Sequence, residues 1–107
     1  MLTFFLPLFL VVGQKPMVLT IGDVLMTRHP TTSAPMEIAV FTIHQRYDAT
    51  LVFDWDFGDD TTATTTSPSI THHYVTADTY FFRVVVTDTH NHLTAKLLRL
   101  ITVAPPR

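Results

Sequence analysis

Four aspartates within seven residues form the densest group of reactive side chains in this sequence. They are Asp54, Asp56, Asp59 and Asp60. Carboxylate oxygens at this density could bind Ca²⁺, and a pair of carboxylates could hydrolyse a glycosidic bond. The spacing lacks the EF-hand pattern, and nothing in the sequence predicts the cleft or the raised pKa that a glycosidase needs. The four aspartates are therefore weak candidates for a metal site, and we expect no catalytic residue.

The residues around the first two aspartates alternate as in a β-strand. Phe53, Trp55 and Phe57 share one face of an extended segment, residues 51–57. Asp54 and Asp56 share the other face. Because the aromatic face belongs in a core, we expect these two aspartates to be solvated strand residues.

A tight acidic turn follows this segment. Gly58 permits a positive φ or a bulge, and the side chains of Asp59, Asp60 and Thr61 can bond turn amides. On this interpretation the carboxylates brace the turn. The sequence favours this brace and leaves calcium binding as the alternative.

The histidines offer another possible metal site. His90 and His92 would share one face of an extended segment, which permits a transition-metal site. Asn91 between them favours a turn instead, and the sequence suggests no third ligand. We expect exposed turn histidines, and a metal-dependent enzyme would need a carboxylate to converge on both.

Downstream motifs give the acidic turn a family context. After W-D-F-G-D-D-T at residues 55–61 come His72 with Tyr74, Asp78 with Tyr80, and Val86 with Asp88. In this order and spacing, residues 16–104 resemble a PKD domain, the Ig-like module first named in polycystin. The resemblance implies an all-β fold, an Ig-like β-sandwich of two antiparallel sheets with about seven strands.

The same resemblance implies structural roles for nine motif residues. They are Trp55, Asp56, Phe57, Gly58, Asp59, His72, Tyr74, Tyr80 and Asp88. His72 would brace the acidic turn by hydrogen bonding. Tyr74 and Tyr80 could be exposed binding anchors, but at a sandwich corner we favour half-buried rings with their hydroxyls bonded to backbone. Asp60 and Asp78 stand where the family usually has glycine. Because aspartate tolerates the left-handed region better than most residues, we expect both turns to be kept.

The composition bounds the class of protein. The chain has 107 residues, no cysteine and a net charge of −2. One domain of this size can bury a sufficient core, and disulfides and thiolate metal sites are excluded. The absence of a basic stripe argues against nucleic acid and anionic membrane surfaces as partners. Abundant threonine, valine and aromatic residues favour strands.

Turn residues divide the chain into seven expected strands. They are residues 17–21, 24–27, 36–43, 51–57, 70–73, 80–88 and 93–103. A bend at Gly22 and Asp23 separates the first two, and residues 28–35 with two prolines form a loop. The inward face of the third strand is ambiguous, because Ile38 and Val40 alternate with Phe41 and Ile43. We favour the face that carries Ile38 and Val40.

The two ends of the sequence differ in composition from its middle. Residues 1–13 are mostly apolar and too short to span a bilayer. They suit either a signal peptide, although a positively charged start is missing, or a hydrophobic segment of a larger protein. The expected domain is residues 14–104, and residues 105–107 begin a linker because two prolines stop the last strand.

The resemblance implies a non-catalytic module, without cofactors, in a larger and membrane-anchored protein. It would be extracellular or lumenal, as an ectodomain or in a secreted protein. The module would act as a mechanical spacer and as a protein–protein interaction or cell-adhesion domain. Its partners would be neighbouring domains of the same chain, extracellular protein ligands and, on a second view, glycans, without direct insertion into a membrane.

That second view is an accessory carbohydrate- or matrix-binding module of a secreted hydrolase or sorting receptor. Such binding uses exposed aromatic side chains in a row. Phe41, Tyr47 and Phe81 are the candidates. Burial of all three would remove the main support for this alternative.

Overall fold

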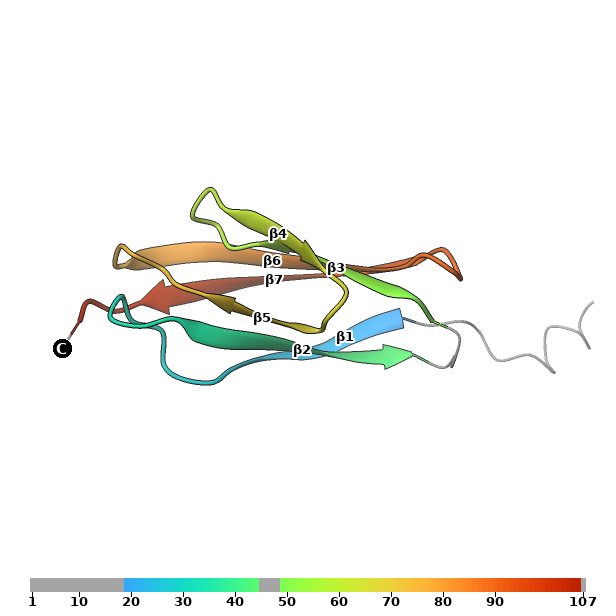
Figure 1. Cartoon of the computed structure of the whole chain (residues 1–107), viewed down its shortest axis with the longest axis horizontal. Coiled ribbons are helices and arrows are strands. Elements are labelled where there is room, and N and C mark those ends of the chain that lie inside the picture. The colour runs from blue at the N-terminus through green and yellow to red at the C-terminus, as the bar shows by residue number, and fades with distance from the viewer. Residues whose placement is uncertain (1–18, 45–48, 107) are drawn as a thin grey trace, which may run out of the picture.

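The computed structural model describes residues 19–44 and 49–106, which form two antiparallel sheets packed face to face (Figure 1). The strands are β1 (Leu19–Met26), β2 (Met36–His44), β3 (Leu51–Asp56), β4 (Thr62–Thr65), β5 (Ser69–His72), β6 (Asp78–Asp88) and β7 (Leu93–Val103). One sheet has the order β1-β2-β5 and the other β4-β3-β6-β7. The predicted all-β, Ig-like β-sandwich is confirmed. Among the described residues no helix is long and apolar enough to cross a membrane.

Several predicted features lie outside the described residues. They are the apolar segment 1–13, the first two residues of the expected strand 17–21, and Tyr47. The start of the expected domain at residue 14 lies there too.

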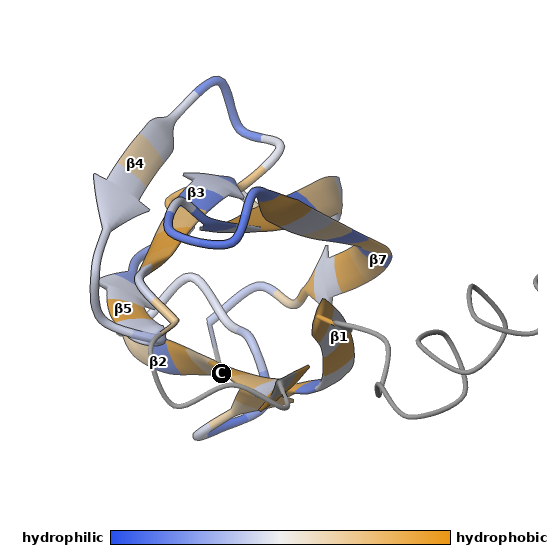
Figure 2. Cartoon of the chain, turned by 90° about the vertical axis from the view of Figure 1, so that its right-hand side faces the viewer, coloured by the Kyte–Doolittle hydropathy of each residue, from blue (hydrophilic) through white to orange (hydrophobic). Residues whose placement is uncertain are grey.

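The core lies between the two sheets and is built by alternation along each strand. On the four-stranded sheet the inner face carries Phe53, Trp55, Phe82, Val84 and Val86, all buried. On the three-stranded sheet, Ile38 and Val40 of β2 are buried against this face. The inward face favoured for β2 is therefore confirmed. Figure 2 shows the two layers from one end, with apolar and polar residues alternating along the strands.

The two short segments expected at the start are one strand, β1. The expected bend is a bulge, because the pairing with β2 shifts between Ile21 and Asp23. Asp23 stabilises it by accepting a 2.7 Å hydrogen bond from the amide of Val24. A bulge adds one unpaired residue without ending the strand, so the turn-like pair Gly22-Asp23 does not separate two strands.

Strand β4 was not predicted as a strand. It pairs with β3 along residues 62–65 and is the short edge of its sheet. Its threonine-rich sequence has no alternation of apolar and polar residues that would indicate a strand. In the structure Ala63 and Thr65 turn partly inward. Thr65 accepts a 2.9 Å hydrogen bond from Trp55 Nε1, which satisfies the buried indole. The remaining strand bounds agree with expectation to within two residues.

The two sheets are also tied along one side. β1 and β7 run side by side in the same direction, and a parallel bridge joins Thr31 to Ala104. Ala104 N donates to Pro30 O at 3.0 Å, and Thr32 N donates to Ala104 O at 3.1 Å. In Figure 1, β1 begins towards the right and the C-terminus lies at the left. The described chain therefore enters and leaves the sandwich at opposite ends.

Candidate functional site

The acidic turn begins where β3 ends and depends on one glycine. Gly58 has φ of 83°, and a Cβ there would lie 2.5 Å from the carbonyl oxygen of Phe81 on β6. No other residue type fits this contact without a shift of backbone. Asp56 Oδ1 accepts the Gly58 amide at 3.0 Å, and the Phe57 amide donates to Thr61 O at 3.2 Å. The turn is thus pressed against β6.

Asp59 joins the acidic turn to the other sheet. Its Oδ2 lies 2.8 Å from Nε2 of His72 on β5, and its Oδ1 accepts hydrogen bonds from the amide and hydroxyl of Thr61. Both partners are largely buried, with side chains 17% and 13% exposed. Although burial acts to raise the pKa of Asp59, the hydrogen bonds from Thr61 and His72 outweigh it and hold this pKa below the ordinary value.

Aromatic rings complete this contact between the sheets. The His72 ring stacks on Phe57 at 3.8 Å with an interplanar angle of 2°, and meets the edge of Tyr74 at 4.6 Å. The Tyr74 hydroxyl donates to Phe57 O at 2.7 Å. We call Phe57, Asp59, Thr61, His72 and Tyr74 the clasp. The predicted brace of the acidic turn by His72 has this geometry.

The two tyrosines of the motif differ in burial. Tyr74 is 2% exposed, deeper than the half-buried position expected, because the rings of His72 and Tyr80 pack against it. Burial, followed by the nearby carboxylate of Asp59, raises the pKa of Tyr74, so its hydroxyl remains a donor. Tyr80 is half-buried as expected, stacks on Tyr74 at 4.5 Å and donates to Thr76 O.

Asp88 lies far from the clasp, at the other end of β6. It is fully buried, and its Oδ1 accepts the amides of Thr50, His90 and Asn91 at 3.1, 3.0 and 3.2 Å. Asn91 Nδ2 donates to its second oxygen at 2.7 Å. Asp88 therefore fixes the β6–β7 turn, and the motif residues occupy two ends of the sandwich instead of one site.

The four weak metal candidates do not converge on one point, although Asp54 and Asp56 share the outer face of β3. Asp54 accepts from Thr64 on the outer face, and Asp59 faces His72. Asp56 lies beside Gly58, and Asp60 lines the outer face of the turn. Within residues 19–44 and 49–106, no group of three His, Cys, Asp or Glu side chains could hold a metal ion.

The remaining turn predictions have mixed outcomes. Asp60 has φ of 68°, so aspartate does take the left-handed conformation at this glycine position. Asp78 instead begins β6 opposite Val103, where the backbone is extended, so no left-handed turn is needed there. His90 and His92 lie exposed in the β6–β7 turn. His92 has φ of 59°, a conformation that the sequence did not predict at that residue.

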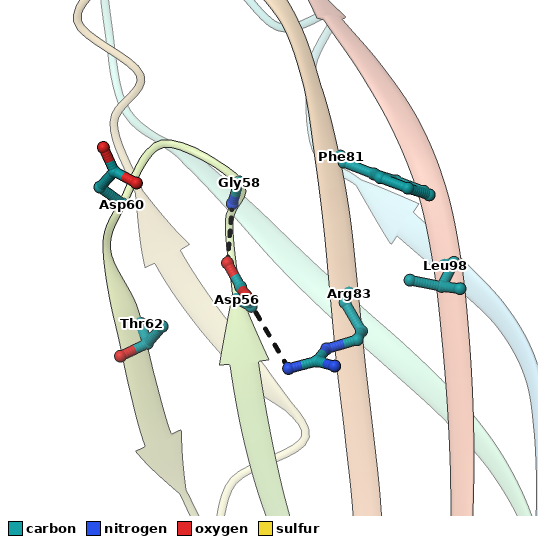
Figure 3. Close-up of a pocket in the computed structure, with 7 residues that line it drawn as sticks. All are labelled: Asp56, Gly58, Asp60, Thr62, Phe81, Arg83 and Leu98. Atoms are coloured by element: carbon teal, nitrogen blue, oxygen red, sulfur yellow. Dashed lines mark hydrogen bonds and ion pairs between the residues drawn. The ribbon is translucent and has the colours of Figure 1, made fainter.

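Two grooves flank the acidic turn. The clasp groove, of about 450 Å³, is lined by Gly58, Asp59, Asp60, Thr61, His72, His73, Val75, Thr76 and Tyr80. The outer groove, of about 540 Å³, lies on the outer face of the four-stranded sheet and is lined by Asp56, Gly58, Asp60, Thr62, Phe81, Arg83 and Leu98 (Figure 3). Sequence reasoning missed Arg83 and Leu98 here. The alternation along β6 and β7 places both side chains on the outer face, and this pattern could have identified them.

The candidate aromatic residues do not form a row. Phe81 is 59% exposed and Phe41 is 61% exposed. Phe41 lies on β2 and Phe81 on β6, so they occupy the outer faces of different sheets. Because neither side chain is buried, these two residues do not remove the support for the carbohydrate- or matrix-binding alternative. A single aromatic platform through both is excluded, because they lie on different sheets.

Solved structures with this fold are similar in shape and distant in sequence. A structure of carbohydrate-binding modules from the β-sandwich superfamily has a TM-score of 0.71 and 24% identity, covering 86% of this chain and 36% of that chain. The PKD domain of the human VPS10 domain-containing receptor SorCS2 has a TM-score of 0.64 and 18% identity, covering 88% and 81%. The PKD1 domain of the Vibrio cholerae metalloprotease PrtV has a TM-score of 0.58 and 18% identity, covering 81% and 98%.

These likenesses establish the fold alone, and this chain spans about a third of the carbohydrate-binding-module structure. No curated protein matches the sequence. The sequence model of the PKD domain matches residues 24–103, which contain the acidic turn, the clasp and Asp88. The chain therefore belongs to the PKD domain family.

Proposed function

We propose that this chain is a non-catalytic module of a larger, membrane-anchored protein, in which it spaces neighbouring domains outside the cell or in a lumen. PKD domains are generally non-catalytic modules, and one similar PKD domain comes from a human receptor. Its partners would be the adjoining domains and extracellular proteins, through protein–protein or cell-adhesion contacts. The domain of residues 14–104, followed by a proline linker, is the proposed unit.

The observation that carries this proposal is the arrangement of the terminal strands. β1 and β7 run side by side in the same direction, and the chain leaves them at opposite ends. Tension through neighbouring domains would therefore pull the two strands past each other. The backbone bonds of Ala104 with Pro30 and Thr32 would be loaded in shear, so they would have to break together.

The clasp reinforces the same sandwich on its other side. It joins the acidic turn after β3 to β5, and these elements belong to different sheets. Separation of the sheets under tension would have to break the Asp59–His72 contact and the Tyr74 hydrogen bond. Buried hydrogen bonds of this kind contribute about 1.5–3 kcal/mol when a charged group takes part.

Single-molecule pulling in two directions tests this function. Because the chain has no cysteine, engineered cysteines set the attachment points. The pair Thr20→Cys and Pro106→Cys loads β1 against β7 in shear, whereas Arg28→Cys and Pro106→Cys would peel the Thr31–Ala104 bridge from one end. We expect clearly higher unfolding forces in shear, because forced unfolding follows the barrier along the pulled direction. Equal forces would remove the mechanical basis of the proposal.

The clasp gives a second set of variants in the shear direction. Asp59→Ala and His72→Ala should each lower the unfolding force, since each removes the contact between the sheets. Asp54→Ala is the matched control, because that carboxylate bonds an exposed threonine within one sheet. If the clasp variants pull like the control, the clasp adds no mechanical reinforcement.

A second candidate function is an accessory carbohydrate- or matrix-binding module of a secreted hydrolase or sorting receptor. It is favoured by the exposed Phe81 at the wall of the outer groove. Similar structures include carbohydrate-binding modules and a domain of a metalloprotease, which supports an accessory role in such proteins. Binding of the intact chain to a panel of polysaccharides tests the carbohydrate-binding form of this function, and failure to bind any would reject that form.

A further inference from the structure

The outer groove has one apolar wall and one polar wall (Figure 3). Phe81 and Leu98 form the apolar wall, while Asp56, Asp60 and Thr62 line the opposite side. Arg83 lies between the walls and points towards Asp56. The groove therefore presents an apolar surface beside hydrogen-bonding groups of both kinds.

The polar groups in this groove have spare hydrogen-bonding capacity. Arg83 Nη2 lies 3.9 Å from Asp56 Oδ2, which is longer than a hydrogen bond, and the two side chains are 51% and 41% exposed. Asp56 uses its other oxygen for the Gly58 amide. A half-exposed pair at this distance adds little to stability. Guanidinium donors and a carboxylate oxygen therefore remain available to a ligand.

The apolar wall continues beyond the groove. Phe81 lies directly opposite Leu100, and Arg83 lies opposite Leu98 across the β6–β7 pair. Phe81, Leu98 and Leu100 are 59%, 57% and 67% exposed. Neighbouring exposed apolar side chains beside convergent polar groups are typical of a ligand surface.

Charge narrows the class of ligand. The groove holds two carboxylates, Asp56 and Asp60, against one guanidinium, so an anionic ligand would be repelled. A wholly apolar ligand would bury Asp56 and Arg83 without partners, which is unfavourable. A neutral pyranose satisfies both walls, because its C–H face can lie on an aromatic ring while its hydroxyl groups donate and accept.

Given the second candidate function above, on which this inference rests, we propose that the outer groove binds a neutral polysaccharide. One sugar ring lies on Phe81, and its hydroxyl groups bond to Asp56 and Arg83. The groove crosses four strands, a width of about 14 Å at the usual strand spacing. That width suits a chain of rings better than a single ring, and the volume of about 540 Å³ is within the range of small-ligand sites.

Phe41 offers a matched control for Phe81. It is 61% exposed against 59%, and it lies on the outer face of the other sheet. Phe81→Ala and Phe41→Ala remove the same side chain from surfaces of similar exposure. Both variants should therefore fold, which their thermal unfolding would check. Arg83→Met keeps the aliphatic stem and removes the donors.

The experiment is affinity electrophoresis of the full chain in gels with hydroxyethyl cellulose as the neutral glucan, galactomannan as a second neutral chain, and polygalacturonate as the anionic probe. We expect retardation by at least one neutral polysaccharide. Phe81→Ala should weaken this binding by about tenfold, Arg83→Met should weaken it measurably, and Phe41→Ala should leave it unchanged.

The results that would contradict the proposal have different meanings. If the wild-type chain binds no polysaccharide, the carbohydrate-binding form of the second candidate function and this inference both fail. If it binds but Phe41→Ala abolishes binding while Phe81→Ala does not, the function stands and the outer groove is the wrong site. Retardation by polygalacturonate alone would overturn the charge argument. Capture of a protein partner through Phe81, without polysaccharide binding, would likewise overturn the proposal.

Discussion

The clasp groove and the outer groove share the acidic turn, but their polar atoms are committed differently. In the clasp groove, Asp59 is bonded to His72 and Thr61, and the Tyr80 hydroxyl is bonded to Thr76. In the outer groove, Arg83 lies too far from Asp56 for a hydrogen bond. Asp56 and Asp59 lie close together in the sequence but commit their second carboxylate oxygens differently. One side of the turn holds the two sheets together, and the other is open to a partner.

Gly58→Ala should disturb both sides at once and have the largest effect. The new Cβ would lie 2.5 Å from Phe81 O at a positive φ, so the turn would have to move away from β6. We expect a loss of about 3 kcal/mol, from overpacking and backbone strain together. Denaturant unfolding measures it.

Gly22→Ala is the control for that variant. A Cβ at Gly22 would meet Ile43 Cδ1 at 3.6 Å, an ordinary contact. We expect its effect to stay within about 0.5 kcal/mol. Similar losses for the two alanine variants would show that the close approach to Phe81 is not what requires a glycine at residue 58.

His72→Ala should break the clasp side alone. It leaves the largely buried Asp59 carboxylate without its imidazole partner and removes the ring stacked on Phe57. We expect a loss of about 2 kcal/mol in the free energy of unfolding. His73→Ala, next in sequence, removes one exposed hydrogen bond to Thr32 O and should cost about 0.5 kcal/mol. Equal costs would contradict the special role of His72.

Acid should weaken the clasp in a defined pH range. The pKa of Asp59 is lowered on folding, so its contribution to stability is complete above its ordinary value of 3.8. That contribution is lost as the pH falls below 3.8 through the folded-state pKa. Wild type should therefore lose its advantage over Asp59→Asn as the solution is acidified.

Unfolding midpoints of wild type and Asp59→Asn across that pH range measure this loss. In a His72→Ala background the pH-dependent difference between Asp59 and Asn should shrink, because one of the hydrogen bonds that lowers the pKa is absent. A difference that stays constant from neutral to acidic pH would contradict the account.

Asp60→Gly should have the smallest effect. It relieves a non-glycine residue at φ of 68°, while the more flexible unfolded chain offsets part of the gain. We expect a stabilisation of about 0.5 kcal/mol, measured by denaturant unfolding. A clear destabilisation would mean that the Asp60 side chain holds the turn, as the sequence had suggested for both Asp59 and Asp60.

Local patterns explain which parts of this structure could be predicted. Phe53 and Trp55 alternate with aspartates, so the sequence predicts which face of β3 is buried. Both faces of β2 carry apolar residues, so periodicity alone left its inward face open, and the favoured face of Ile38 and Val40 is the buried one. The His72 contact was reached through the family motif. Strand β4 could not be predicted because its threonines show no apolar alternation, and they form a strand only by pairing with β3.

The outer groove could not be predicted because it depends on register between distant strands. Asp56 meets Arg83 only through the β3–β6 pairing, and Leu98 joins them only through the β6–β7 pairing. A slip of one residue would place these side chains on the other face. The burial of Tyr74 likewise depends on three segments meeting at the clasp.

Two parallel double-mutant cycles test the central contrast most directly. The first combines Asp59→Ala with His72→Ala, and the second combines Asp56→Ala with Arg83→Ala, with unfolding free energies measured at neutral pH. We predict a coupling of about 1.5 kcal/mol for the clasp pair and less than about 0.5 kcal/mol for the groove pair. Equal couplings, or a clasp coupling near zero, would contradict the division of the acidic turn into a structural side and an open side.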